Sequence, residues 1–371
     1  MTSRYCGMIH HGVSVNQDGS LAPCCQYHTA HKPLHFYQYQ EFCHSVRGQM
    51  QQDLDQDRPH AGCSKCYQEE ELGLISLRNY VNNWHNNTET QVLDPANEIW
   101  DFELRLGNVC NLKCIMCHPG ASSSIATERY QHNILFGPVG LGIDKPTAIR
   151  AWWESSEFRR FFIQRMGSVK RLNITGGEPF MIPAVFDLLN DIDNTELELS
   201  FNTNLTVINQ RVIDVLNRFA KLSIVASLEG TGTMNDYLRY PSKWSDIVAN
   251  LRQLRSKVPH ARLKINHTFQ HTSVYSLPDL VKFSRKNVMP LQLTMVQGMD
   301  FLTLDSVPSS DIAKFHAWVE QDKFIDSNIK PFLTNAVQTH RFDPDKAQRF
   351  RDYVATLDKI RGTNYNMTFC P

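Results

Sequence analysis

The chain has 371 residues, of which 42% are hydrophobic and 20% are charged. At roughly 150 residues per domain, this length predicts about two to two and a half globular domains. Lys plus Arg and Asp plus Glu each number 38, so the formal net charge is zero, which argues against a nucleic-acid partner and a polybasic membrane anchor. No apolar run approaches the roughly 18 residues of a membrane-spanning helix, so we expect a soluble protein.

The ten cysteines are too sparse for a disulfide scaffold, and they are unevenly distributed. Six lie at or before Cys66, three lie from Cys110 to Cys117, and the last is Cys370. The first residues, MTSRYCGMIHHG, lack the basic start and apolar stretch of a secretory signal, so we expect a cytoplasmic location. Clustered cysteines in that reducing compartment favour metal or redox chemistry over disulfides.

Residues 1–96 are rich in His, Gln and Cys and show little apolar periodicity. We expect a small loop-rich module that needs a metal or a neighbouring domain for stability. The segment after Cys66 is predicted to be helical and to pack the module against the next domain. Residues 86–98 are predicted to be a linker, and Cys43, in a helical segment, to be a buried small apolar residue.

Residues 97–305 alternate short apolar strands with amphipathic helices, a pattern typical of a parallel α/β sheet. Six strands are predicted, at 98–106, 169–175, 197–203, 222–228, 263–269 and 291–296. Residues 306–371 are predicted to form a helical C-terminal extension. Because ligands bind beyond the carboxyl ends of the strands in such sheets, we expect the functional site there.

The segment GNVCNLKCIMCHPG follows the first of these strands and places Cys110, Cys114 and Cys117 in a C-x3-C-x2-C pattern. Three thiolates on one tight loop can hold three irons of a 4Fe-4S cluster and leave the fourth iron open for a ligand. The alternative is a structural zinc loop, for which His118 would supply a fourth ligand.

With this loop the sequence resembles the radical SAM superfamily, whose hallmark is a CxxxCx-(aromatic or apolar)-C loop after the first strand of a partial (β/α)6 barrel. The resemblance implies an α/β fold of that kind, with a small cysteine-rich N-terminal module and a helical C-terminal extension. It also implies that the cluster binds S-adenosylmethionine and cleaves it reductively to methionine and a 5'-deoxyadenosyl radical. Met116 matches the position that packs on the adenine.

Further matches follow at successive strand ends. Residues 175–179, TGGEP, resemble the family's GGEP, in which the carboxylate of Glu178 would bind the methionyl ammonium. Residues 202–204 and 227–230 resemble the polar segments after the third and fourth strands. Arg239 would bind the methionyl carboxylate through its planar fork. The resemblance thus implies these cofactor-binding residues: Met116, Gly176, Gly177, Glu178, Asn202, Asn204, Ser227 and Arg239.

The N-terminal cysteines form a second group, made of a lone thiol, a pair after a DG turn, and the C-x2-C of residues 63–66. The phrase G-x-x-x-P-C and the C-x2-C resemble SPASM and twitch domains, which carry auxiliary 4Fe-4S clusters, although that module usually follows the barrel. We expect four ligands, with Cys25 as an alternative to Cys24: Cys6, Cys24, Cys63 and Cys66. A structural zinc held by the same four thiolates is the rival interpretation.

The function expected from this resemblance is hydrogen abstraction from a substrate by the deoxyadenosyl radical, with Cys110, Cys114 and Cys117 holding the catalytic cluster. SPASM and twitch enzymes often cross-link or epimerise ribosomally made peptides, so a peptide is the leading substrate class. A small metabolite (an amino acid, sugar or nucleoside) is the second. Flavodoxin or ferredoxin is the expected electron donor, and Cys370 is considered as a hydrogen donor for epimerisation. From a different class, the rival is a zinc-binding interaction protein.

Overall fold

The computed structural model describes residues 5–28, 33–87, 99–134 and 151–369. Cys370 and most of the predicted linker at 86–98 lie outside these residues. The described part has a mixed α/β fold around one sheet, which confirms the predicted fold class. Its strands are β1 Gly12–Val15, β2 Leu21–Ala22, β3 Asp101–Arg105, β4 Arg171–Thr175, β5 Glu198–Thr203, β6 Lys221–Ser227, β7 Arg262–Phe269 and β8 Leu291–Met295.

The sheet has the strand order β2-β1-β3-β4-β5-β6-β7-β8, and every neighbouring pair is parallel except β1 and β2. The six strands predicted from sequence are β3 to β8. The two others come from the cysteine-rich N-terminal block, because β1 pairs with β3 from Gly12 opposite Asp101 to Val15 opposite Leu104. The N-terminal block therefore extends the sheet of the barrel.

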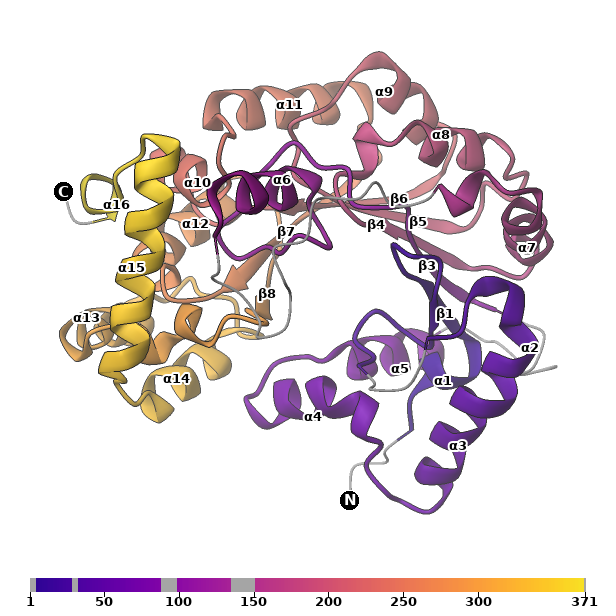
Figure 1. The fold of residues 1–371 in the computed structure, drawn as a ribbon, viewed down its shortest axis with the longest axis horizontal. Coiled ribbons are helices and arrows are strands. Elements are labelled where there is room, and N and C mark those ends of the chain that lie inside the picture. Colours follow the sequence, from indigo (N-terminus) through magenta and orange to yellow (C-terminus); the bar gives the residue numbers. More distant parts are fainter. Residues whose placement is uncertain (1–4, 29–32, 88–98, 135–150, 370–371) are drawn as a thin grey trace.

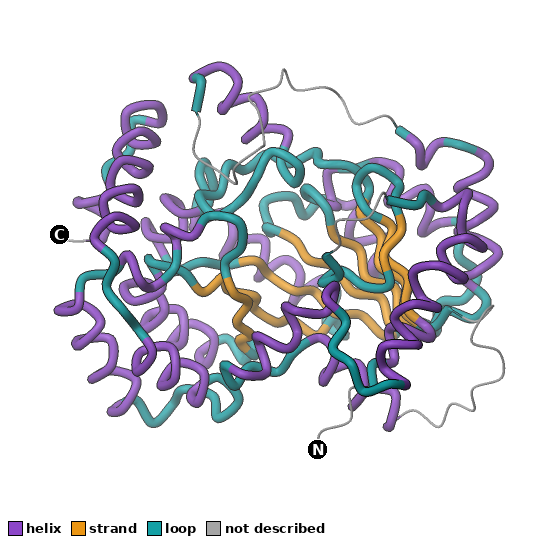
Figure 2. The backbone as a smooth tube through the Cα atoms, turned by 60° about the horizontal axis from the view of Figure 1, so that its bottom comes forward, coloured by secondary structure: helices purple, strands orange, loops and turns teal. Residues whose placement is uncertain are grey.

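Helices lie around the sheet (Figures 1 and 2). Before β3 they are α1 Gly7–His11, α2 Tyr39–Phe42, α3 Gly48–Asp55, α4 Ser64–Glu71 and α5 Leu77–Asn87. Between β3 and β8 they are α6 Ser123–His132, α7 Ser156–Met166, α8 Pro183–Asn190, α9 Gln210–Leu216, α10 Gly232–Leu238, α11 Trp244–Lys257 and α12 Ser273–Lys286. After β8 follow α13 Ser309–Gln321, α14 Lys330–Thr339, α15 Pro344–Arg361 and α16 Tyr365–Phe369, which confirms the helical extension.

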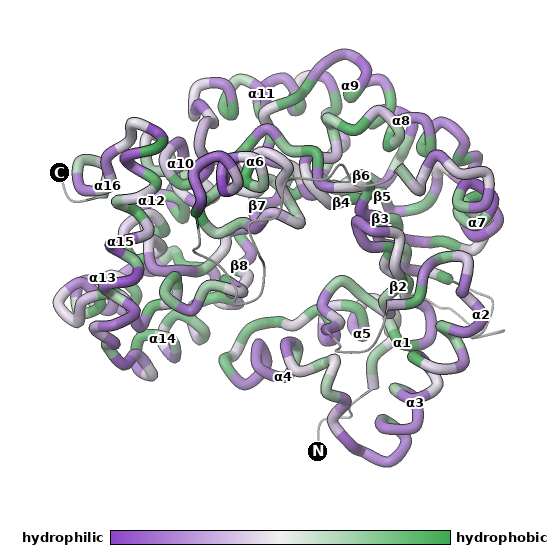
Figure 3. The backbone as a smooth tube through the Cα atoms, in the orientation of Figure 1, coloured by the Kyte–Doolittle hydropathy of each residue, from purple (hydrophilic) through white to green (hydrophobic). Residues whose placement is uncertain are grey.

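Strand alternation divides the sheet into an apolar and a polar face. In β5, Leu199 and Phe201 are fully buried in the main core, where the Phe201 ring lies 4.9 Å from that of Phe180. Figure 3 shows apolar and polar segments interleaved along the backbone. The opposite face carries a polar row in register across five strands: Ser14, Glu103, Asn173, Ser200 and Ser223. The inner face of this barrel is therefore polar at mid-height.

The turn between α4 and α5 joins the N-terminal block to the C-terminal extension. Leu74 is buried in the main core together with Phe332 of α14. Gly73, at a φ of +83°, lies close enough that a Cβ there would be 3.8 Å from the Phe332 nitrogen. Figure 1 shows α4 and α14 next to each other at the lower side of the view. This contact connects the two sides of the open barrel.

In the described ranges, no helix combines the length and apolar character that crossing a bilayer requires.

Candidate active site

The loop between β3 and α6 carries Cys110, Cys114 and Cys117, at the carboxyl end of the sheet as expected. Backbone hydrogen bonds hold the loop at two points. The Glu178 amide donates to the Val109 carbonyl at 2.7 Å, and the Ile115 amide donates to the Leu238 carbonyl at 3.0 Å. The end of β4 and the end of α10 thus fix the cysteine loop from two sides.

Burial controls the ionisation of the three thiols. It raises the pKa of Cys110, the pKa of Cys114 to about 12 and the pKa of Cys117 to about 11. Repulsion from Cys110 and Cys117 also raises the pKa of Cys114, so the three thiols lie within electrostatic range of one another. Thiols in this environment keep their protons at neutral pH until a metal ion displaces them.

Arg239 is the cation beside these thiols. Its guanidinium pairs with the buried Glu229 at 3.1 Å, while its Nε is buried without a hydrogen-bond partner. Burial opposes its charge, but Cys114 and Glu229 outweigh burial, so the pKa of Arg239 lies above its usual value. Glu229 is itself fixed, because it accepts from the Thr268 amide at 2.9 Å. The sequence segment 227–230 contains Glu229, but only the structure shows that it orients Arg239.

In the described part of the chain, no group of three or more His, Cys, Asp and Glu side chains is arranged in a way that could hold a metal ion. The fit of a cluster is therefore judged from the donor set and its surroundings. Three thiols on one loop, within electrostatic range of one another, and a buried cation with an unpaired Nε suit an anionic metal–thiolate group and a carboxylate ligand. The residues present fit a 4Fe-4S cluster with bound S-adenosylmethionine.

Glu178 connects the ends of β4 and β5. Its carboxylate is fully buried and accepts from the Thr203 hydroxyl at 2.7 Å, the Asn204 amide at 2.7 Å and the Phe180 amide at 3.3 Å. Burial raises the pKa of Glu178 to about 7, against these hydrogen bonds. The carboxylate is thus engaged within the protein, and its contact with a methionyl ammonium stays a prediction.

Gly177 allows the end of β4 to touch the cysteine loop. A Cβ at this position would lie 2.1 Å from the Val109 carbonyl oxygen and 2.7 Å from the Asn108 carbonyl carbon, distances that no real Cβ adopts. Gly176 has a φ of +129°, a conformation open to glycine. Both glycines were predicted to bind the cofactor, and in the structure Gly177 approaches the loop that carries the cysteines.

Asn204 links the end of β5 to the cysteine loop. Its Nδ2 donates to the side-chain oxygen Oδ1 of Asn111 at 3.0 Å and lies 3.9 Å from the Cys110 sulfur. Thr206 completes this network by accepting from Asn111 at 2.9 Å. Sequence reasoning missed Asn111 and Thr206, because nothing in their local sequence indicates that they meet. Leu205, the next residue, is fully buried at a φ of +60°.

The remaining predicted residues lie at strand ends or beside the loop. Asn202 is exposed near the end of β5, and Ser227 ends β6 in register with Asn266. Met116 packs against the C-terminal core of α15 and α16, which includes Tyr353 and Phe369. The structure therefore gathers Glu178, Asn204 and Arg239 around the cysteine loop, while cofactor contacts of the other residues stay predictions.

The second cysteine group lines one cavity. Cys6, Cys24, Cys63 and Cys66 surround it together with Arg78. Burial raises the pKa of Cys6 to about 11 and the pKa of Cys63 to about 12. Electrostatic repulsion from Cys6 and Cys66 adds to the rise at both Cys24 and Cys63. The structure thus brings together the four residues that the sequence selected.

Cys25 lies on the other side of the same turn. Its carbonyl accepts from Arg105 at 3.3 Å, and its thiol is close to the carboxylate of Glu103 on the polar face of β3. Cys24 therefore faces the cavity and Cys25 faces the sheet. Cys43 is half-buried and packs against the main core, 3.8 Å from a guanidinium nitrogen of Arg47.

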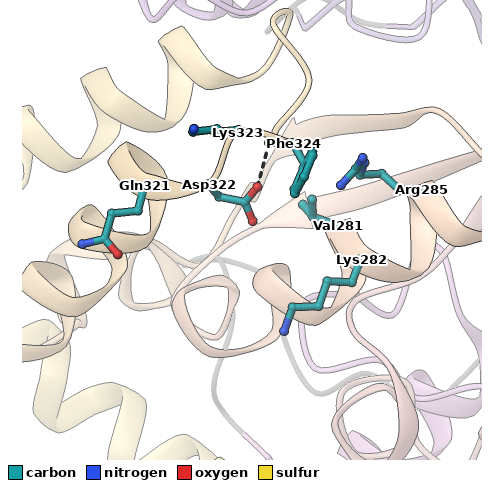
Figure 4. A pocket seen from close by; sticks show the side chains of 7 residues that line it. All are labelled: Val281, Lys282, Arg285, Gln321, Asp322, Lys323 and Phe324. Atoms are coloured by element: carbon teal, nitrogen blue, oxygen red, sulfur yellow. Dashed lines mark hydrogen bonds between the residues drawn. The ribbon is translucent and has the colours of Figure 1, made fainter.

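A separate surface hollow lies between α12 and the segment after α13 (Figure 4). Arg285 of α12 stacks on the half-exposed ring of Phe324 at 3.6 Å, and Asp322 accepts from the Phe324 amide at 2.7 Å. None of the motif residues lines this hollow: its lining is Val281, Lys282, Arg285, Gln321, Asp322, Lys323 and Phe324.

Residues 104–273 match the model of the Radical SAM superfamily. This stretch, a radical SAM domain, includes the cysteine loop and the carboxyl ends of β3 to β7.

Among curated proteins, the chain is similar to the "Probable GTP 3',8-cyclase" of Methanocaldococcus jannaschii, with 24% identity over 192 residues. The match covers 51% of this chain and 56% of that protein, so the chain spans about half the length of the curated relative it matches.

Solved structures with similarity to the chain include Streptococcus suis SuiB bound to precursor peptide SuiA. That match has 15% identity, covers 82% of this chain and 61% of that chain, and has a TM-score of 0.39. Native anSMEcpe with bound AdoMet matches with 14% identity over 57% of this chain and 56% of that chain, at a TM-score of 0.40. Matches at these TM-scores assign no substrate to this chain.

Proposed function

We propose that the chain binds a 4Fe-4S cluster through Cys110, Cys114 and Cys117 and uses it to cleave S-adenosylmethionine reductively. When bound, the cluster would supply the electron that converts the cofactor to methionine and a 5'-deoxyadenosyl radical. That radical abstracts a hydrogen atom from the substrate. The observation that carries the proposal is the set of three close thiols with the buried, partly unpaired Arg239 beside them.

The protein's own groups have distinct roles in this proposal. Arg239 binds the methionyl carboxylate through its free Nε side while Glu229 holds its other edge. Asn204 and Glu178 orient the cysteine loop through their contacts with Asn111 and Val109. Met116, Gly176, Gly177, Asn202 and Ser227 complete the proposed cofactor-binding set.

We propose an auxiliary 4Fe-4S cluster on Cys6, Cys24, Cys63 and Cys66. The shared cavity supports this set, and the orientation of Cys25 toward Glu103 supports Cys24 as the ligand. Four thiolates also suit zinc, so the metal must be measured.

For the substrate we propose a ribosomally made peptide that is cross-linked, epimerised or modified in a related way. The polar face of the sheet supports an uncharged polar ligand such as a peptide backbone, since its arginines are neutralised: Arg171 pairs with Asp101 at 3.0 Å and Arg105 with Glu103 at 2.8 Å. A polyphosphate ligand would need unpaired cations there. A small metabolite (an amino acid, sugar or nucleoside) is the alternative, and flavodoxin or ferredoxin is the proposed electron donor.

Anaerobic reconstitution with iron and sulfide tests the proposal. We expect a coloured protein that produces 5'-deoxyadenosine from S-adenosylmethionine and dithionite. The variant Cys114→Ala should lose this product, whereas Cys43→Ala, which changes a cysteine packed on the main core, should retain it. A colourless protein that binds only zinc would refute the enzyme and support the interaction protein. Two results together would identify the auxiliary cluster. The Cys114→Ala variant would retain iron, and the Cys63→Ala variant would lose part of its iron.

A further inference from the structure

The C-terminal helix α15 packs directly against the cysteine loop, although it lies outside residues 104–273. The hydroxyl of Tyr353 donates to the Ile115 carbonyl at 2.7 Å, in the middle of the C-x3-C-x2-C pattern. Tyr353 and Leu357 line a small cavity together with Cys114 and Cys117. The wall on this side of the proposed cluster is therefore supplied by residues more than 200 positions away.

Glu128 of α6 lies in this wall, and its charge is already neutralised. Arg361 of α15 donates to it at 2.6 and 3.2 Å, and Lys113 of the cysteine loop pairs with it at 3.2 Å. Glu128 and Arg361 are almost fully buried, with 3% and 4% of their side chains exposed. Two cations thus share one carboxylate, which leaves no negative charge there for a third.

Arg129, the next residue of α6, is that third cation. It is 8% exposed and lines the same cavity as Cys114 and Cys117. The groups that its guanidinium contacts are neutral: Nη2 lies 4.0 Å from the Met299 sulfur, and the guanidinium hydrogen-bonds the Tyr353 hydroxyl. Within the described residues it has no carboxylate partner. A buried guanidinium without a counter-charge is costly, so the site is electrostatically incomplete.

The three thiols are the negative partner that this site lacks. Arg129 shares the lining of one cavity with Cys114 and Cys117, two of the proposed cluster ligands. A 4Fe-4S core with three thiolates carries a net negative charge that grows by one on reduction, and net charge near a cluster sets its reduction potential. Because Glu128 is occupied by Arg361 and Lys113, Arg129 directs its charge at the thiolates.

We propose that Arg129 is a positioning residue for the catalytic cluster: it acts as the counter-charge that stabilises the reduced state, and α15 holds it there through Tyr353. This inference rests on the proposed function, because it requires a cluster on Cys110, Cys114 and Cys117. It goes beyond that function by giving α6 and the C-terminal extension a role in electron transfer.

The test is a redox titration of the reconstituted holoenzyme, followed by EPR. The measured quantity is the midpoint potential of the catalytic cluster, which is recognised because its EPR signal changes when S-adenosylmethionine is added. In Arg129→Met we expect a shift to more negative potential with the iron content of the wild type. Arg129→Lys, which keeps the charge, should retain the wild-type potential. The matched control is Arg351→Met, which removes the same charge from an exposed position on α15.

Apo-protein stability gives a second readout. Removing an uncompensated buried charge should leave apo Arg129→Met as stable to urea as the wild type, or more stable. A purely structural arginine would instead lose stability in the apo state. An unshifted potential in Arg129→Met, or an equal shift in Arg351→Met, would overturn the inference while leaving the proposed function intact. A wild type without any signal that responds to the cofactor would overturn the proposed function itself.

Discussion

Substitution of Gly177 by alanine tests how the end of β4 supports the cysteine loop. The added Cβ would lie 2.1 Å from the Val109 oxygen and 2.6 Å from the Val109 carbonyl carbon, and both are backbone atoms. To restore an ordinary contact, the loop must retreat by about 1 Å, and overpacking of this kind costs about 1–3 kcal/mol. The retreat also weakens the hydrogen bond from the Glu178 amide to Val109, currently 2.7 Å long.

We therefore expect Gly177→Ala to lower the free energy of unfolding by about 1–3 kcal/mol and to reduce the iron held after reconstitution. Urea unfolding followed by circular dichroism measures the first effect, and an iron assay measures the second. Gly167→Ala is the matched control, because no heavy atom lies within 4 Å of the new Cβ; its unfolding free energy should change by no more than about 0.5 kcal/mol. If Gly177→Ala unfolds at the wild-type urea concentration and binds the wild-type amount of iron, the contact does not position the loop.

Three further predictions concern buried groups. Burial lowers the pKa of His271 to about 3, so between about pH 6.5 and 3 the unfolded chain binds a proton that the folded chain does not. The unfolding free energy should thus fall as the pH drops through this window, by up to about 1.4 kcal/mol per pH unit from this residue, and His271→Gln should flatten the slope in urea titrations from pH 7 to 4. Glu178→Gln should destabilise the fold by about 1–3 kcal/mol in thermal or urea unfolding, because an amide cannot accept from the Thr203, Phe180 and Asn204 donors together; unchanged stability would show that these bonds contribute nothing. Cys24→Ser should lower the reconstituted iron content, whereas Cys25→Ser should not, and the reverse result would exchange their roles.

The strands that could be predicted from sequence are those with a long regular alternation. The six strands β3 to β8 are confirmed because each presents apolar residues at every second position, as in LELSFNT. The strands β1 and β2 were missed because they have only 4 and 2 residues. In β1, Val13 and Val15 alternate with the polar Ser14 as in the longer strands, but two apolar positions are too few for a periodic pattern.

The motifs at the strand ends were visible in the sequence, but their partners were not. Cys110 and Asn204 belong to recognisable segments, whereas Asn111 and Thr206 meet across 95 positions. The contact of Tyr353 with Ile115 spans 238 positions. Contacts of that range depend on the completed fold, so local periodicity and motif spacing carry no signal for them.

The pairing of β1 with β3 has a consequence for how this chain can be divided. Without residues 1–96, one side of β3 would present unpaired amides and carbonyls next to the cysteine loop, and open edges of this kind recruit strands from other molecules. The N-terminal cysteines are also anchored to this strand pair, since β2 ends just before Cys24. The strand pair β1–β3 therefore connects the two cysteine groups. The N-terminal block, which carries Cys6, Cys24, Cys63 and Cys66, also covers the edge of β3, the strand that leads into the loop of Cys110, Cys114 and Cys117.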